Sequence, residues 1–246
     1  IDFADPQNPV FLFTASFVRF RMTGHHLRVV LTNTHHLWEN RLGVVINGEQ
    51  FGVLLDWNTR ACLEGRFPDE TVDRICADDD PCGFFGYEDR MDAGEDFDSI
   101  WPDVVAEQGE RVAGIFRYYI AHYDDALPRM LPGMERLLRD LKAAGYGVWG
   151  LTNWSHETFH FAFEKFPQLA ELLQGTIVSG VEKMHKPNAD IYELAMSRFG
   201  LSPESSVFLD DTAKNVAGAR SAGMHAFRFV DADQARRDLE SLGVRV

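Results

Sequence analysis

The second half of the chain alternates between helical and strand-like patterns of hydrophobic positions. Residues 133–144 carry apolar side chains at helical spacing, and residues 147–151 form a short apolar run that predicts a buried strand. The same pattern predicts helices from about 157, over 188–199, up to 222 and at the C-terminal end, and strands at 176–179, 206–209 and 225–229. Strands separated by single helices predict an α/β fold with a parallel sheet and right-handed crossovers.

Residues 60–126 have a different texture, helix-rich and acidic. An apolar stripe over 111–122 predicts a helix, and the whole segment looks like a helical insertion between the first strand and the rest of the sheet. The acidic run over 88–98 is interpreted as solvated helix ends rather than as a cation site.

Composition narrows the classes of partner. The 246 residues carry a net charge of −14, which disfavours a nucleic-acid backbone as the main partner. No apolar run reaches the roughly 20 residues of a membrane-spanning helix, so no membrane association is expected. Three cysteines, Cys62, Cys76 and Cys82, form an odd set without metal-site spacing, which favours the reducing cytoplasm. We expect a monomer or homodimer that acts on a small molecule.

Polar residues follow the predicted strands where ligands of parallel sheets bind, at the strands' carboxyl ends. Asp210 and Asp211 are adjacent carboxylates whose mutual repulsion calls for a hard cation, most plausibly Mg²⁺. Lys186 offers a positive charge to an anion, and Thr152 and Asn153 offer hydrogen-bond donors to phosphate oxygens. Each feature alone has a plain structural interpretation, such as a helix cap or a loop. Their joint order favours a site for an oxyanion and a metal.

This order resembles the haloacid dehalogenase (HAD) superfamily of hydrolases, over about residues 52–228. Leu151-Thr152-Asn153 looks like the second motif of that family, Lys186 in His-Lys-Pro-Asn like the third, and Val207 to Asp211 like the fourth, which binds the metal. The residues that follow resemble the small-cap branch, and within it the sugar-phosphate phosphatases of the glucose-1-phosphate type.

The resemblance implies a HAD-like Rossmannoid parallel sheet flanked by helices, Mg²⁺, and hydrolysis of small phosphate monoesters. It also implies a core of residues 41–58 and 127–246, a small helical cap of residues 59–126 after the first strand, and an atypical N-terminal segment of residues 1–40. Dehalogenation is a sister activity that we rank lower, because carbon–halogen cleavage has no use for Mg²⁺.

The first motif departs from the family pattern, in which an aspartate attacks phosphorus to form an aspartyl-phosphate. An ungapped alignment of residues 52–58 places Glu49 at the nucleophile position and Phe51 at the acid/base position. Glutamate is longer by one methylene, and a displaced attacking oxygen costs rate. Phenylalanine cannot transfer a proton.

Two other alignments of the first motif stay open. If residues 42–46 are the first strand, Asn47 takes the nucleophile position. If residues 51–55 are the strand, Asp56 takes it, with Asn58 two residues later. Residues 1–48 carry four arginines against three acidic residues, unlike the acidic remainder. Either the natural beginning has been replaced, or the chain has diverged into a catalytically inactive HAD-like binding protein.

One motif also fits a different class of protein, the zinc metallopeptidases. His156-Glu157-Thr158-Phe159-His160 fits the zinc-metallopeptidase pattern, in which a helix presents two imidazoles on one face and the glutamate acts as base. We rank it lower, because the HAD-like pattern accounts for the surrounding residues and the zinc pattern for these alone.

Overall fold

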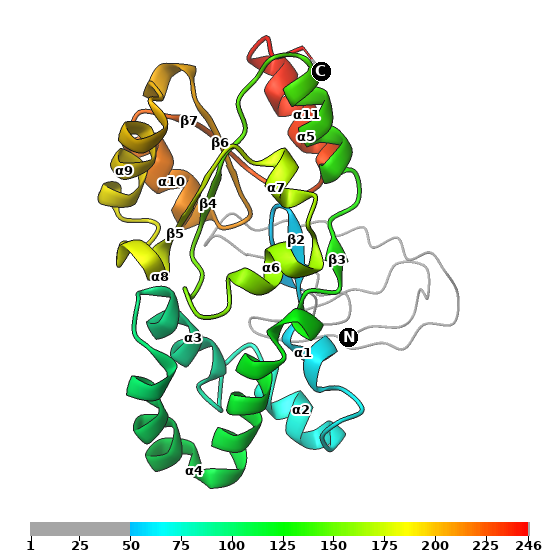
Figure 1. Ribbon diagram of the computed structural model, residues 1–246, viewed down its shortest axis with the longest axis vertical. Coiled ribbons are helices and arrows are strands. Elements are labelled where there is room, and N and C mark those ends of the chain that lie inside the picture. The colour runs from blue at the N-terminus through cyan, green and yellow to red at the C-terminus, as the bar shows by residue number, and fades with distance from the viewer. Residues whose placement is uncertain (1–49, 246) are drawn as a thin grey trace, which may run out of the picture. The chain divides into compact units, whose positions relative to one another are not determined.

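The computed structural model describes residues 50–245 (Figure 1). Glu49, Asn47 and the possible strand at residues 42–46 lie outside the described residues, as does the atypical segment 1–40.

Two pairs of parallel strands form the sheet structure of the second half. β4 (Gly150–Thr152) pairs with β5 (Thr176–Val178), and β6 (Val207–Asp210) pairs with β7 (His225–Arg228). The connecting helices are α6 (His160–Lys165), α7 (Leu169–Leu172), α8 (Ser179–Glu182), α9 (Ala189–Phe199), η2 (Pro203–Ser205) and α10 (Ala213–Ser221). The predicted α/β alternation with parallel pairing is therefore confirmed.

One apolar cluster joins the two strand pairs. Ile177 of β5, Phe208 of β6 and Ala226 of β7 are all buried in it, together with Tyr192 of α9. Burying an aliphatic or aromatic side chain of this kind contributes about 1.5–3 kcal/mol. The carboxyl ends of the strands are held in place by this shared core.

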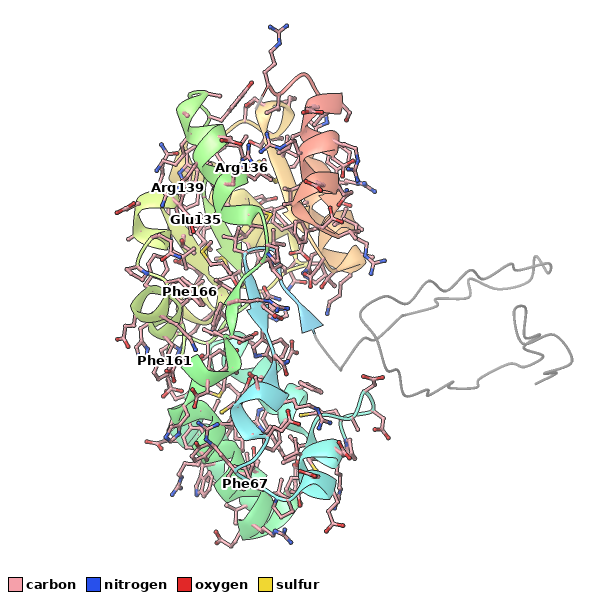
Figure 2. All side chains as sticks on the ribbon, turned by 90° about the vertical axis from the view of Figure 1, so that its right-hand side faces the viewer. Phe67, Glu135, Arg136, Arg139, Phe161 and Phe166 are labelled. Carbon is pink, nitrogen blue, oxygen red and sulfur yellow. The ribbon has the colours of Figure 1, made fainter. Side chains whose placement is uncertain are left out.

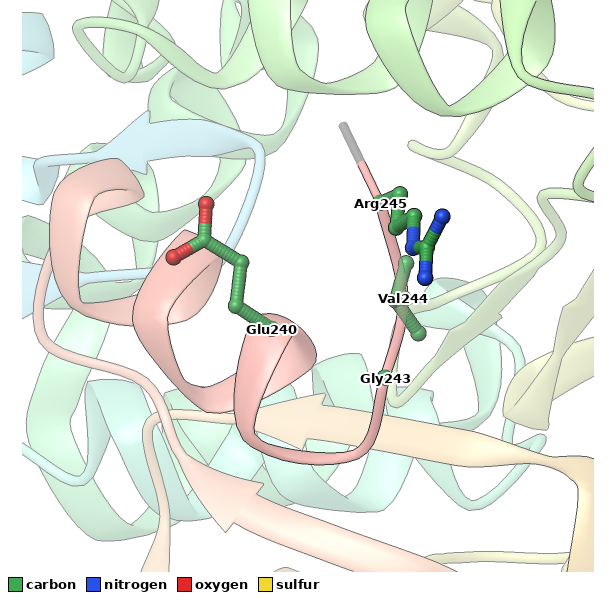
Figure 3. Close-up of a pocket in the computed structure, with 4 residues that line it drawn as sticks. All are labelled: Glu240, Gly243, Val244 and Arg245. Carbon is green, nitrogen blue, oxygen red and sulfur yellow. The ribbon is translucent and has the colours of Figure 1, made fainter.

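Helices α5 (Met134–Ala143) and α11 (Ala232–Ser241) pack together over a second apolar cluster. Leu137 and Leu138 of α5 are buried, whereas Glu135, Arg136 and Arg139 lie on the outer side of the helix (Figure 2). Arg139 donates to Glu135 one turn earlier at 2.7 Å. This division into an apolar and a charged face confirms the helix predicted over 133–144.

The start of the described chain forms an antiparallel hairpin. β1 (Gln50–Phe51) pairs with β2 (Leu55–Trp57), and β2 pairs with β3 (Arg129–Met130). Gly52 lies in the connecting turn, where a Cβ atom would come within 2.6 Å of the Leu55 carbonyl oxygen. The chain therefore reverses between 51 and 55, and the alternative that made these residues one continuous strand is wrong.

Residues 59–126 are helical, as expected, and Figure 1 shows their helices gathered at one end of the described part. The elements are α1 (Thr59–Leu63), α2 (Asp69–Ile75), α3 (Phe84–Asp92), α4 (Phe97–Ala121) and η1 (Tyr123–Ala126). α4 is longer than the helix predicted over 111–122, because it continues through a kink at Gly109, whose φ is +77°. Phe84, Phe116 and Tyr119 form the aromatic centre of this segment.

Two element boundaries after α5 differ from the sequence prediction. β4 begins at Gly150 rather than at 147, and the Val148 N–H donates to the Gln174 side chain instead of a strand. The helix expected from about 157 begins only at His160. Within residues 50–245, no helix is both long and apolar enough to cross a membrane. The three cysteines form no disulfide.

Candidate functional site

Three strand-end segments meet in the structure. Thr152 ends β4 and Asn153 follows it, Asp210 ends β6, and Lys186 lies in the loop between α8 and α9. The sequence predicted this meeting from the rule that the carboxyl ends of parallel strands share one edge of a sheet.

A buried ion pair between Lys186 and Asp210 lies at the centre of the site. The Lys186 Nζ atom is 2.7 Å from Asp210 Oδ2, and the two side chains are 9% and 3% exposed. The other carboxylate oxygen of Asp210 accepts hydrogen bonds from the Thr212 backbone N–H at 2.9 Å and from Asn215 Nδ2 at 3.0 Å. Because a buried charge is costly unless it is paired and hydrogen-bonded, these donors hold the carboxylate in one position.

Asn153 fixes the backbone of the lysine loop. Its Oδ1 atom accepts from the Lys186 N–H at 2.9 Å, and its Nδ2 donates to the Lys186 carbonyl at 3.0 Å. The second Nδ2 hydrogen faces His185 Nε2 at 2.8 Å. In this structure the Asn153 amide therefore positions Lys186, while the neighbouring Thr152 hydroxyl bonds only the Asn153 carbonyl, at 3.3 Å.

Asp211 lies beside Asp210 with a raised pKa. Burial raises the pKa of its carboxyl to about 6, and the neighbouring Asp210 charge adds to this, against the opposing effect of Lys186 and Arg228. A site whose own carboxylates repel each other suits a divalent cation with oxygen ligands. The donor set of Asp210 and Asp211 thus fits Mg²⁺, although among residues 50–245 no group of three or more Asp, Glu, His or Cys is placed to hold a metal.

Carboxylates of α3 also lie near the site, and sequence reasoning missed them. Burial raises the pKa of Asp92 to about 7, with a further increase from Asp89 and a decrease from Lys186. The Ser179 hydroxyl donates to the Asp92 backbone carbonyl at 2.5 Å, which ties α3 to the start of α8. Asp89 Oδ1 lies 3.2 Å from His185 Nε2.

The interpretation of residues 88–98 as solvated helix ends is therefore wrong for part of the run. Glu88 is buried, accepts from the Tyr119 hydroxyl at 2.7 Å, and has a pKa well above the usual range because burial disfavours its charge. Tyr119 in turn accepts from Trp57 Nε1 at 2.9 Å. Glu88 and Asp92 are four residues apart and share one face of α3, but this spacing alone does not distinguish a buried face from a solvated one.

Asp56, the nucleophile of one alternative alignment, lies in the middle of the antiparallel sheet. It is 1% exposed, and its Oδ2 pairs with Arg129 at 2.9 Å. Its structural partner is thus β3 across the hairpin rather than the lysine loop, which gives the Asp56 alternative no support.

The zinc-peptidase pattern is not presented on a helix. Since α6 begins at His160, His156 and Glu157 precede it. His156 Nε2 lies 3.2 Å from Asp96, and the Glu157 carboxylate accepts from the Phe97 N–H at 2.6 Å. Both side chains hold the turn between α3 and α4, so the structure gives the zinc alternative no support.

A family model for haloacid dehalogenase-like hydrolases matches residues 83–223, which is more than half of the chain. The chain belongs to this family. The match contains the strand-end residues of the second, third and fourth motifs, as the sequence resemblance implied.

Curated relatives of the HAD-like chain include phosphatases and a dehalogenase. It is 31% identical over 109 residues to the sesquiterpene phosphatase astK of Aspergillus oryzae, covering 44% of this chain and 55% of that protein. It is 30% identical over 116 residues to flavin mononucleotide hydrolase 1 of Arabidopsis thaliana, covering 47% and 46%, respectively. A third relative is (S)-2-haloacid dehalogenase 4A of Burkholderia cepacia, with 31% identity over 98 residues, covering 40% and 42%. The chain spans about half the length of these relatives.

Solved structures share the fold. A HAD family enzyme from Bacteroides thetaiotaomicron in complex with magnesium superposes with a TM-score of 0.58 at 18% identity, covering 75% of this chain and 93% of that one. A dehalogenase with an intermediate complex gives the same TM-score and identity, covering 79% and 94%. The HAD-like α/β fold is therefore established for this hydrolase-family chain.

Proposed function

We propose that the strand-end residues form a Mg²⁺-dependent site for hydrolysis of small phosphate monoesters, of the sugar-phosphate type, in the cytoplasm. The observation that carries the proposal is the buried Lys186–Asp210 pair at 2.7 Å. Asn153 hydrogen-bonds to the backbone of Lys186 and holds this loop in place. The arrangement combines a cation for phosphoryl oxygens with carboxylates for a metal.

The residues divide the chemistry among them. Lys186 has two further N–H donors for a phosphoryl oxygen and for the attacking carboxylate. The Thr152 hydroxyl, together with the Asn153 N–H that faces His185 in this structure, would orient the phosphate. Asp210 and Asp211 would hold Mg²⁺, which supplies charge neutralisation for the phosphate. The helices of residues 59–126 would form the cap over the substrate.

In the proposed reaction, a Glu49 carboxylate oxygen bonds to phosphorus as the ester P–O bond breaks. The departing alkoxide takes its proton from water, because Phe51 cannot donate one. Water then hydrolyses the acyl-phosphate and regenerates Glu49. The extra methylene of Glu49 and the absent proton donor make turnover slow while leaving phosphate binding in place.

A second candidate function is phosphate binding without turnover. The residues at positions 49 and 51 favour it, because glutamate displaces the attacking oxygen and phenylalanine cannot donate a proton. The experiment measures release of p-nitrophenol from p-nitrophenyl phosphate with and without Mg²⁺, and binding of inorganic phosphate by calorimetry. Wild type is expected to show slow, Mg²⁺-dependent release, Lys186→Ala at least a 100-fold loss, and Glu49→Asp an increase of 10-fold or more.

Circular dichroism checks whether Lys186→Ala is folded, and Asp211→Asn, at a half-buried position, provides a second variant in case it is not. If wild type binds inorganic phosphate but releases no p-nitrophenol, the protein is a phosphate-binding protein rather than a phosphatase. Neither release nor binding, in wild type and in Glu49→Asp, would overturn the phosphate site itself.

A further inference from the structure

One ring nitrogen of His185 faces both a hydrogen-bond donor and a hydrogen-bond acceptor. Its Nε2 atom lies 2.8 Å from the Asn153 amide nitrogen and 3.2 Å from the Asp89 carboxylate. Asn153 belongs to the strand-end site, whereas Asp89 belongs to α3 in the helical segment. His185 thus lies between the phosphate site and a helix of the proposed cap.

The orientation of the Asn153 amide is fixed independently of the histidine. Its oxygen accepts from the Lys186 N–H and its nitrogen donates to the Lys186 carbonyl, so the atom facing His185 is a donor. A neutral imidazole accepts this hydrogen bond with the lone pair on Nε2. That lone pair cannot donate to Asp89, and a protonated Nε2 cannot accept from Asn153. The nitrogen therefore serves one partner at a time.

Burial of the ring favours its neutral form. Burial lowers the pKa of His185, Lys214 of α10 and the adjacent Lys186 lower it further, and Asp89 opposes them. The imidazole therefore takes up a proton only below the usual pH range of histidine.

We propose that His185 is a positioning residue whose Nε2 alternates between Asn153 and Asp89, and so couples the docking of α3 to the state of the phosphate site. The inference rests on the proposed function of Asn153 and Lys186. In the neutral form, the ring holds Asn153 and leaves Asp89 without its ionic partner. In the protonated form, the ring holds α3 through Asp89 and frees one Asn153 N–H for a phosphate oxygen.

Two consequences follow from this alternation. Protonation strengthens the attachment of α3, which Ser179 maintains in either form through the Asp92 carbonyl. By thermodynamic reciprocity, an anion that uses the freed N–H must raise the proton affinity of His185.

The first test is an NMR titration of the full chain with ¹⁵N-labelled histidine. We expect His185 to be neutral at pH 7.5 with its proton on Nδ1, and Asp89→Asn to shift its titration to lower pH. Asp96→Asn is the matched control, because it removes an equivalent carboxylate from His156 at the same 3.2 Å separation. It should leave the titration of His185 unchanged.

The second test follows hydrogen exchange of α3 between pH 4.5 and 7.5, corrected for intrinsic rates, in an Asp92→Asn background, because ionisation of Asp92 on α3 would itself change the protection of this helix. In that background, protection of α3 should fall as the pH rises, and adding His185→Gln, whose amide oxygen is a permanent acceptor for Asn153, should weaken this dependence. Added Mg²⁺ and inorganic phosphate should move the wild-type histidine titration to higher pH.

A His185 titration that is unaffected by Asp89→Asn, or α3 protection with the same pH dependence in Asp92→Asn and in Asp92→Asn with His185→Gln, would overturn the inference. Because Asp89 is 71% exposed, its variant is expected to fold. The titration and exchange experiments without phosphate test this inference even if the chain has no phosphatase activity. Conversely, turnover combined with an insensitive His185 would refute only this inference.

Discussion

Lys186 and Asp210 depend on each other energetically. Both side chains are almost fully buried, so removal of either leaves the other charge without compensation, which typically costs about 3–5 kcal/mol. The Asn153 bonds to the Lys186 backbone restrict the lysine further. Loss of activity in a Lys186 variant has to be separated from loss of folding.

Asp92 gives a prediction for the pH dependence of stability. Its pKa rises to about 7 in the folded chain, so the folded state disfavours the ionised carboxylate and wild-type stability falls as the pH rises from about 4 to about 7. Asp92→Asn removes this penalty. At pH 8 the variant should have the higher free energy of unfolding, by roughly 1–3 kcal/mol, since each pKa unit corresponds to about 1.4 kcal/mol.

Urea denaturation at pH 4.5 and pH 8 checks this prediction. The two proteins should converge at the lower pH, where wild-type Asp92 is protonated. Glu193→Gln on the exposed side of α9 is the control and should change neither value. A destabilised Asp92→Asn protein at pH 8 would contradict the assignment of a burial penalty.

At the level of single residues, sequence patterns predicted the main site and missed its surroundings. Asn153, Lys186 and Asp210 lie at or after elements with clear periodicity, so the strand-end rule was sufficient to predict that they meet. Asp89 and Asp92 could not be assigned in this way, because their proximity to His185 and Lys186 depends on how α3 docks.

Among the elements, α3 and α8 meet at a close approach that tolerates no added side chain. A Cβ atom at Gly180 would lie 2.7 Å from the His156 nitrogen, 2.8 Å from the Trp154 oxygen and 3.1 Å from the Met91 oxygen. All three are backbone atoms, two of them in the segment after β4 and one in α3, so both α3 and that segment have to move away from α8 to accommodate even a methyl group.

Gly180→Ala should therefore destabilise the protein by about 1–3 kcal/mol and loosen α3. Thermal unfolding gives the first quantity, and hydrogen exchange of α3 gives the second. Gly114→Ala in α4 is the matched control, because no atom beyond the adjacent helical backbone lies within 4 Å of its added methyl group and alanine favours a helix by about 1 kcal/mol. Equal stability of the two variants would refute the steric argument.

The helices and strands that local sequence determines were predictable, whereas those that depend on distant contacts were not. Long amphipathic helices such as α5 were recognisable because their apolar positions recur with the helical period. The late start of α6 was not, because Glu157 bonds the Phe97 N–H, 60 residues earlier, instead of continuing a local helix. The antiparallel hairpin at Gly52 likewise depends on the β3 strand that follows the helical segment.

At the scale of the whole molecule, a bound ligand should stabilise the folded chain without any turnover. Mg²⁺ with inorganic phosphate at 100 times its dissociation constant adds about 2.7 kcal/mol to the free energy of unfolding. For a chain of this size we expect a rise in Tm of roughly 5–10 °C.

Differential scanning fluorimetry checks this rise in wild type and in Asp211→Asn, which lacks one proposed metal ligand. Mg²⁺ alone, phosphate alone and both together separate the two contributions. The combined shift should be at least halved in the variant. An undiminished rise in Tm in Asp211→Asn would show that Asp211 is not a metal ligand.

The contact between Glu157 and the start of α4 also bears on the order in which the chain acquires its structure. Asp96 makes no side-chain cap for this 25-residue helix, and the Phe97 N–H is bonded by Glu157 instead. During ribosomal synthesis, Phe97 is made 60 residues before Glu157. The first turn of α4 therefore gains this acceptor only after the later segment has been made, so completion of the helix start depends on the part of the chain that follows it.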